Sequence, residues 1–198
     1  MTIPRLRSFF YFVSVLALVG GAALLAYGQW SKPSIDAERA IQARDSEGAL
    51  RAYAVSVARF REREPMQQLL RNDYARIAHN QLALLYRAGQ YDTVIDAAGS
   101  APPDASPHFW VGCAMFAKSL QEKGAEGQLD WLTRAEDEFK LALGAEPEDW
   151  DTKYNYELSA RLVAEMRRPP KPGSTPAPIK LLRPQGQSQP REATKKVG

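Results

Sequence analysis

The chain contains little of what catalytic and metal sites are usually built from. Its 198 residues include one cysteine and two histidines. A single cysteine excludes an internal disulfide, and Cys113 stands among apolar neighbours, which favours a buried, inert thiol over a reactive one. His79 has Ala83 rather than a second ligand one helical turn later, and no other spacing typical of metal ligands occurs. We therefore expect no metal site.

Glycine-rich phosphate-binding motifs and calcium loops are absent as well. Neither G-x-x-x-x-G-K-[ST] nor G-x-G-x-x-G is found in the sequence. Acidic residues do cluster late in the chain, but they lack the spacing and the turn glycine of a calcium-binding loop: Glu136, Asp137, Glu138, Glu146, Glu148, Asp149 and Asp151. A solvated acidic face is the simpler interpretation. The sequence therefore predicts a protein that is not an enzyme and that carries no cofactor.

The net charge of +3 conceals two segments of opposite sign. Residues 120–166 hold twelve acids and five bases, whereas residues 167–198 hold one acid and eight bases. The basic tail also contains seven prolines, which predicts a disordered segment with polyproline character. It lacks interleaved aromatic residues and a folded platform, so we expect no nucleic-acid binding. The acidic segment is either a solvated face or a surface for a basic partner, including the tail itself.

What the sequence does have is a long apolar run near its N-terminus. Nothing between Arg7 and Lys32 is charged, and the central stretch FFYFVSVLALVGGAALLAY, residues 9–27, would extend about 28 Å as a helix. That length matches the hydrocarbon core of a bilayer, and aromatic residues stand at both ends, as in membrane-interface belts. A cleaved signal peptide is the alternative, because AYG at 26–28 resembles a cleavage site. The run is longer than usual signal cores, so we predict an uncleaved anchor over residues 1–31.

The orientation of this anchor depends on the basic residues that flank it. Arg5 and Arg7 precede the run, and Lys32, Arg39 and Arg44 follow it, so the charge bias is small. A short N-terminal segment kept inside is the commoner arrangement. We therefore expect a single-pass protein of a bacterial inner membrane, with the soluble part in the periplasm. In the reverse orientation the basic tail would face an anionic leaflet.

From Ile35 to Arg168 the signals are all helical, which predicts a helical repeat domain over residues 32–166. Apolar residues recur three and four positions apart, and alternating β-branched residues are scarce. Breaks are expected near Asp45 and at Gly89, and the later helices are expected over 109–120, 129–144 and 151–166, with a loop at 122–128. The predicted fold class is all-α: a transmembrane helix, about three helical hairpins, a capping helix and the tail.

Small and aromatic residues recur at fixed intervals within these hairpins. The pattern resembles the second half and the inter-helix turn of a tetratricopeptide repeat (TPR), in which a small residue admits the paired helix, an aromatic residue fills the gap and proline ends the helix: Ala49, Tyr53, Gly89, Tyr91, Ala135, Phe139, Ala142 and Pro147. The intervals from Ala49 to Val94 and from Val94 to Ala135 exceed the repeat's period of about 34 residues. The resemblance therefore implies a short α-solenoid of divergent repeats. Generic helical hairpins are the alternative.

A narrower resemblance covers residues 146–162. The stretch EPEDWDTKYNYELSARL is similar to one in TPR proteins that accompany MoxR-type AAA+ ATPases and von Willebrand A-domain proteins in bacteria, and most of all to the MxaK-type proteins of methanol oxidation operons. Members of this class are small, carry an N-terminal membrane segment and end in a proline-rich tail. The resemblance implies a role in assembly or metal loading of a periplasmic dehydrogenase, with a MoxR-type ATPase or a von Willebrand A-domain protein as partner.

A binding function is the one that remains after these exclusions. Stacked helical repeats form a concave surface that suits an extended peptide or a partner's helix, and the first helix of each pair lines it. The partner-binding candidates there are His79, Asn80, Lys153, Tyr154 and Asn155, with ordinary packing as the alternative for each. We expect a membrane-tethered adaptor or scaffold that assists assembly of an enzyme complex. The alternative is an accessory subunit of an integral membrane complex, held through its transmembrane helix.

Overall fold

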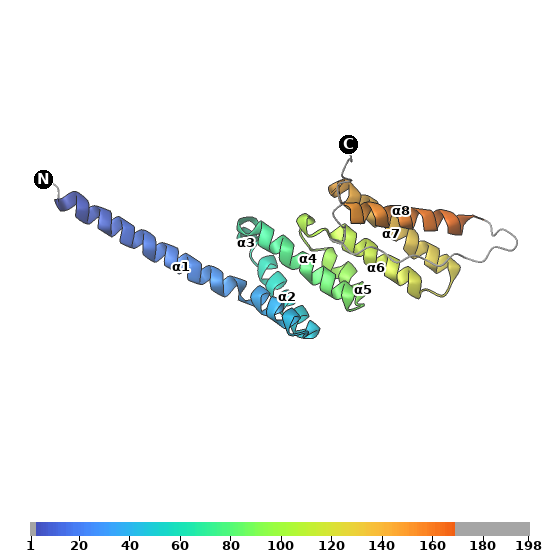
Figure 1. Ribbon diagram of the computed structural model, residues 1–198, viewed down its shortest axis with the longest axis horizontal. Helices are drawn as coiled ribbons and strands as arrows, with labels where there is room; N and C mark the ends of the chain where they lie inside the picture. Colours follow the sequence, from blue (N-terminus) through green and yellow to red (C-terminus); the bar gives the residue numbers. More distant parts are fainter. Residues whose placement is uncertain (1–2, 169–198) are drawn as a thin grey trace, which may run out of the picture. The chain divides into compact units, whose positions relative to one another are not determined.

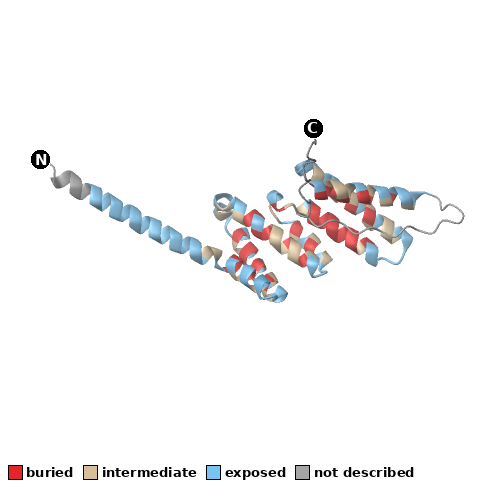
Figure 2. Cartoon of the chain, viewed as in Figure 1, coloured by how far each residue is buried: buried red, intermediate tan, exposed pale blue. Residues whose placement is uncertain are grey.

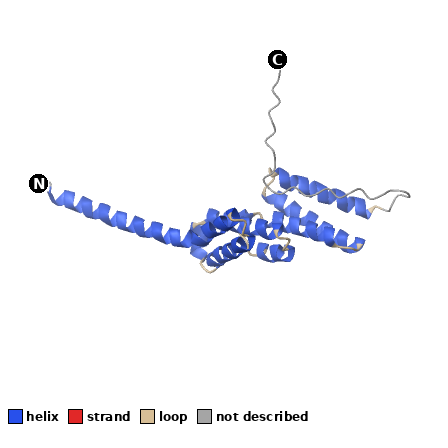
Figure 3. Cartoon of the chain, turned by 60° about the horizontal axis from the view of Figure 1, so that its bottom comes forward, coloured by secondary structure: helices blue, strands red, loops and turns tan. Residues whose placement is uncertain are grey.

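The computed structural model of the protein describes residues 3–168 and is helical throughout. Eight α-helices, α1 to α8, and a short 3-10 helix, η1, follow one another, and the described residues include no strand (Figures 1 and 3). The expected all-α class is confirmed. The chain divides into two compact units, residues 1–70 and 71–198. Apart from Arg167 and Arg168, the predicted disordered tail lies outside the described residues.

Helix α1 (Ile3–Gln42) contains the whole apolar run and continues well past it. Its Phe9–Gln42 part is long and apolar enough to cross a membrane, with a mean hydropathy of 2.2 over its most apolar stretch, and none of that stretch is buried (Figure 2). The boundary that we expected at residue 31 therefore lies inside one continuous helix.

Pro33 stands within α1, where it has no backbone N–H to donate to the carbonyl of Gln29 one turn earlier. Helix α2 (Ser46–Arg61) packs against α1 and supplies a replacement donor. The Arg59 Nη1 donates to the carbonyl oxygens of Gln29 and Trp30, at 3.1 and 3.3 Å. One arginine thus compensates for the proline and fixes the C-terminal end of α2 to α1.

The turn between α1 and α2 lies where the sequence predicts a break. Asp45 is the N-cap of α2, and its carboxylate accepts a hydrogen bond from the Gly48 amide at 2.8 Å. At the other end of this hairpin the Phe60 ring meets the Trp30 ring edge-on, with 5.2 Å between centroids. A short helix that we did not predict, α3 (Glu64–Leu69), then ends the first unit. Its first turn contains a proline, which suits that position.

The second unit is a row of packed helices with α6 at its centre. Its elements are α4 (Arg71–Arg87), α5 (Tyr91–Ala98), η1 (Pro103–Ala105), α6 (Pro107–Gln121), α7 (Ala125–Ala145) and α8 (Trp150–Arg167). Each of the α-helices packs on the next one along the chain, and α4 also contacts α6 (Figure 1). Ten of the fifteen residues of α6 are buried, which explains why its sequence is apolar on every side (Figure 2).

The breaks between these helices follow local signals, with one correction. Gly89 adopts φ +72° directly after α4, a conformation that glycine reaches at little cost. The loop that we expected over residues 122–128 is shorter, because α7 already begins at Ala125, with Gly124 as its N-cap. A single glycine inside a helix, here Gly127, costs only about 1 kcal/mol, less than the burial of the rest of α7 stabilises.

Helices α6 and α7 approach closely where α6 carries Gly112. A Cβ atom at this position would lie 2.8 Å from Cδ1 and from Cε1 of Phe139. The Phe139 ring is fully buried, and so is Ala135 one turn before it. Of the other residues expected to pack within repeats, Ala49, Tyr53 and Ala142 are buried, Tyr91 is half-buried, and Gly89 and Pro147 are exposed in turns.

Candidate functional site

The five predicted partner-binding residues lie in two separate groups within the second unit. His79 and Asn80 belong to α4, whereas Lys153, Tyr154 and Asn155 belong to the start of α8. Helix α4 packs on α5, η1 and α6, and α8 packs on α7. The row of helices therefore places α6 and α7 between the two groups (Figure 1). The structure does not gather the five side chains into one site.

His79 is a packing residue in this arrangement. Its Nδ1 lies 3.3 Å from the carbonyl oxygen of Ala105 and 3.4 Å from the indole Nε1 of Trp110. The two rings also meet edge-on, with 5.3 Å between centroids. Burial lowers the pKa of His79, although the Ala105 carbonyl and the charge of Glu146 act in the opposite direction. A neutral imidazole therefore joins α4 to α6, and little of it faces a partner. Its neighbour Asn80 is half-buried.

The first turn of α8 offers more surface, but through a residue that sequence reasoning missed. Asn155 has no exposed surface, and Tyr154 is half-buried. Trp150 is 62% exposed, and the ammonium nitrogen of Lys153 lies over its ring at 4.8 Å from the centroid. The same nitrogen is 3.9 Å from a carboxylate oxygen of Glu148. Large aromatic side chains are seldom this exposed, and the sequence alone does not show which tryptophan will be.

A second cationic and aromatic group lies on α6 and α7. The Trp131 ring has the Lys118 ammonium 4.5 Å from its centroid and the Arg134 guanidinium 4.6 Å from it. Lys118 also forms an ion pair with Asp92 of α5. These contacts join three helices, so Trp131 is held in place and only part of its ring faces solvent. Nothing in the sequence marked this group, because its members come from three different helices.

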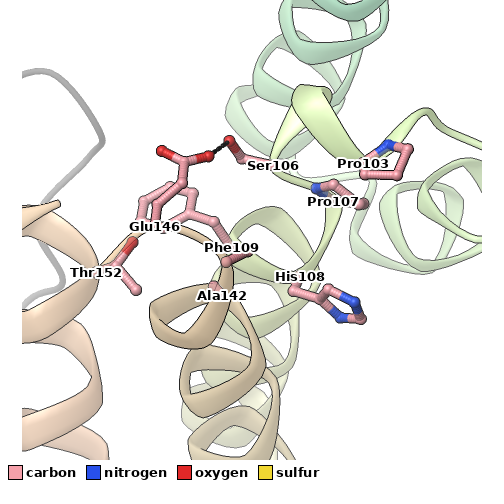
Figure 4. Close-up of a pocket in the computed structure, with 9 residues that line it drawn as sticks. Pro103, Ser106, Pro107, His108, Phe109, Ala142, Glu146 and Thr152 are labelled. Atoms are coloured by element: carbon pink, nitrogen blue, oxygen red, sulfur yellow. Dashed lines mark hydrogen bonds between the residues drawn. The ribbon is translucent and has the colours of Figure 1, made fainter. Parts of the chain in front are cut away.

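A small cavity lies where α6 begins, α7 ends and α8 begins (Figure 4). Its volume of about 20 Å³ suits a water molecule and is far below that of a small-molecule site. The Ser106 hydroxyl donates to Glu146 Oε1 at 2.7 Å, and the His108 ring points away from that hydroxyl (Figure 4). His108 Nδ1 instead lies 2.8 Å from Glu138 Oε2. The cavity therefore does not place a serine nucleophile beside a histidine base.

The described residues hold neither a metal-binding cluster nor an exposed thiol. Residues 3–168 contain no cluster of three or more His, Cys, Asp or Glu side chains able to hold a metal ion. Cys113 is 2% exposed, and burial raises the pKa of its thiol, which keeps it protonated and unreactive. The geometry that remains in the second unit consists of helix surfaces with two aromatic and cationic groups, around Trp131 and Trp150. The chain matches no family model, and neither curated proteins nor solved structures include a significant match to it.

Proposed function

We propose that the protein is a membrane-tethered, non-catalytic adaptor, in which α1 anchors the chain and the second unit binds a protein partner outside the cytoplasm. The observation that carries the proposal is the fully exposed apolar stretch of α1, which is continuous with the α1–α2 hairpin. Apolar side chains at this density are unfavourable in water, whereas a lipid bilayer accommodates them. A helical body that buries its own core needs no such stretch for folding.

One close contact and one buried alanine favour a TPR-like interpretation of the second unit. In the repeat pattern, a Leu-Gly pair in the first helix precedes the small and aromatic residues of the second. Val111 and Gly112 occupy the corresponding place in α6, and Gly112 gives Phe139 of α7 the room that its ring requires. Ala135 is fully buried one turn earlier. The α6–α7 hairpin thus has the packing for which those residue types are suited.

We infer that the partner contacts the first turn of α8. Trp150 is its most suitable anchor, because tryptophan is enriched among the residues that dominate protein interfaces, and Lys153 lies over its ring. The resemblance of residues 146–162 to MxaK-type proteins includes this turn. On that basis a MoxR-type ATPase, a von Willebrand A-domain protein or a periplasmic dehydrogenase is the partner class that we propose.

The accessory-subunit alternative rests on one observation. A Cβ atom at Gly20 or at Gly21 would meet nothing within 4 Å, so the small face of α1 is open to another membrane helix. Under this alternative, Gly21→Leu would disrupt the complex, whereas changes in α8 would not. Exchange of the apolar run for an unrelated anchor would have the same effect as Gly21→Leu.

The test is co-purification of the tagged full-length chain from native membranes in mild detergent, with mass spectrometry of the bound proteins. We expect the double variant Trp150→Ala, Lys153→Ala to lose the partner. The matched control is Glu157→Ala, Arg161→Ala, which changes two exposed residues farther along α8 and should retain the partner. Extraction with alkaline carbonate reports membrane insertion independently. Retention of every partner by the first variant would refute the proposed surface, and release of the chain by carbonate would refute the anchor.

A further inference from the structure

The register of the α1–α2 hairpin places the end of α2 beside the end of the apolar run. Arg59 contacts the carbonyls of Gln29 and Trp30 at 3.1 and 3.3 Å, and the Arg63 guanidinium carbon lies 5.9 Å from the centroid of the Trp30 ring. Trp30 follows Tyr27, the last residue of the run, by three positions, which is about 4.5 Å along a helix axis. Both guanidinium groups therefore lie close to the level at which the run ends.

That level corresponds to the phospholipid headgroups, given the membrane anchorage proposed above, on which this inference rests. A bilayer has a hydrocarbon core about 30 Å thick and a headgroup layer of about 5–7 Å on each side. The run of residues 9–27 spans the core, so Trp30 and the arginines beside it fall within the adjoining layer. Tryptophan is itself enriched there, which agrees with the position of Trp30.

The charge at this level is predominantly positive. Its basic side chains are Lys32, Arg59, Arg61 and Arg63, which we call the basic collar, and its acidic side chains are Glu62 and Glu64. Lys32, Arg61 and Arg63 are exposed, and Arg59 is half-buried. Guanidinium groups suit phosphate oxygens because their paired N–H groups match two oxygens at once. The exposed members of the collar therefore lie at the level of a layer that is rich in phosphate.

Helix α3 adds an apolar side chain to the same end of the hairpin. The Gln67 Nε2 donates to the carbonyl oxygen of Phe60 at 2.9 Å, which holds α3 against the end of α2 (Figure 1). Leu69 of this helix is 75% exposed, as exposed as Leu24 and Leu25 within the apolar run, at 73% and 74%. An exposed leucine at the end of the hairpin that carries the collar is typical of surfaces that rest on a membrane.

We propose that the basic collar binds the phosphate groups of anionic phospholipids and so fixes the α1–α2 hairpin on the membrane surface. The hairpin is then held at two places, by α1 in the core and by the collar in the headgroup layer. Each basic residue near an anionic membrane strengthens binding about fivefold. Anionic lipid should therefore slow the local opening of the hairpin's membrane-facing end.

The experiment is hydrogen exchange of the full-length chain in lipid nanodiscs that contain either zwitterionic phosphatidylcholine alone or an added fraction of anionic phosphatidylglycerol. We expect the amides of residues 57–70 to exchange more slowly in the anionic discs, by at least the factor of about five that a single basic residue supplies. Arg61→Gln, Arg63→Gln should remove most of that difference, because the two basic residues that remain, Lys32 and Arg59, are offset by Glu62 and Glu64. Arg61→Lys, Arg63→Lys keeps the charge and should preserve most of it. Arg59 is left unchanged because it holds α2 to α1.

The matched control is Arg39→Gln, Arg51→Gln, which removes the same charge from the end of the hairpin away from the run. Both residues are exposed and form only surface ion pairs, with Asp36 and Glu47. This variant should respond to anionic lipid as the unaltered chain does. If both Gln variants lost the response to anionic lipid equally, the response would depend on net charge alone. That result would overturn the proposal that the basic collar binds the lipid. Equal exchange rates of the unaltered chain in the two kinds of disc would also overturn the proposed lipid binding. If the chain still co-purified with the discs, the proposed membrane anchor would stand.

Discussion

Gly112 offers the most direct test of how α6 and α7 pack. Replacing glycine by alanine at an ordinary helix position stabilises a protein by about 1 kcal/mol. At Gly112 the new methyl carbon would lie 2.8 Å from two ring carbons of Phe139, whose side chain is fully buried. Forcing an extra methyl into such a core costs about 1–3 kcal/mol. We therefore expect Gly112→Ala to destabilise the second unit by about 1 kcal/mol.

Gly144 supplies the control, because it also lies in a helix but a Cβ atom there would meet nothing within 4 Å. Gly144→Ala should stabilise α7 by about 0.5–1 kcal/mol. Hydrogen exchange of α6 and α7 amides in the full-length chain measures both changes, since about 1.4 kcal/mol is a tenfold change in opening. The double variant Gly112→Ala, Phe139→Leu should lose less stability than the sum of the losses in the two single variants. Equal stabilisation by the two alanines would refute the close contact.

Three further predictions concern single contacts, each measured by hydrogen exchange or urea unfolding of the full-length chain. Arg59→Met should lower the stability of α2 by about 1.5–3 kcal/mol. The loss should be distinctly smaller in a Pro33→Ala background, because the restored amide donates to the Gln29 carbonyl in place of Arg59. Equal losses in the two backgrounds would refute the view that Arg59 compensates for Pro33. His79 has a lowered pKa, so the unfolded chain binds a proton that the folded chain excludes, and stability should fall as the pH drops below about 6.5. His79→Gln should flatten that fall, and an unchanged pH profile would show that other groups cause it. Asp149→Ala removes the acceptor for two amides at the start of α8 and should cost about 1 kcal/mol; full protection of α8 in this variant would contradict the cap.

Local signals were sufficient to predict most of the helices. The exposed apolar run, the break at Asp45 and the glycine after α4 each depend on residues close together in the chain, so periodicity and capping identify them. The predicted helix boundaries were wrong where packing between helices outweighed a local signal. The glycines of residues 122–128 favour a loop, yet α7 begins within that stretch because its later residues are buried against α6 and α8. Helix α3 was missed because six residues carry too short a pattern.

The sequence by itself determined the class of the protein: helices, an apolar segment of bilayer length and a chain poor in catalytic and metal-binding residues. Only the tertiary structure decided which side chains are available. Asn155 and Trp150 lie five residues apart on α8, and packing on α7 buries the first while the second remains exposed. The contact of Arg59 with Gln29 joins residues thirty positions apart. Helical periodicity specifies which residues share a face, but the partner of that face, and hence its exposure, is set by long-range packing.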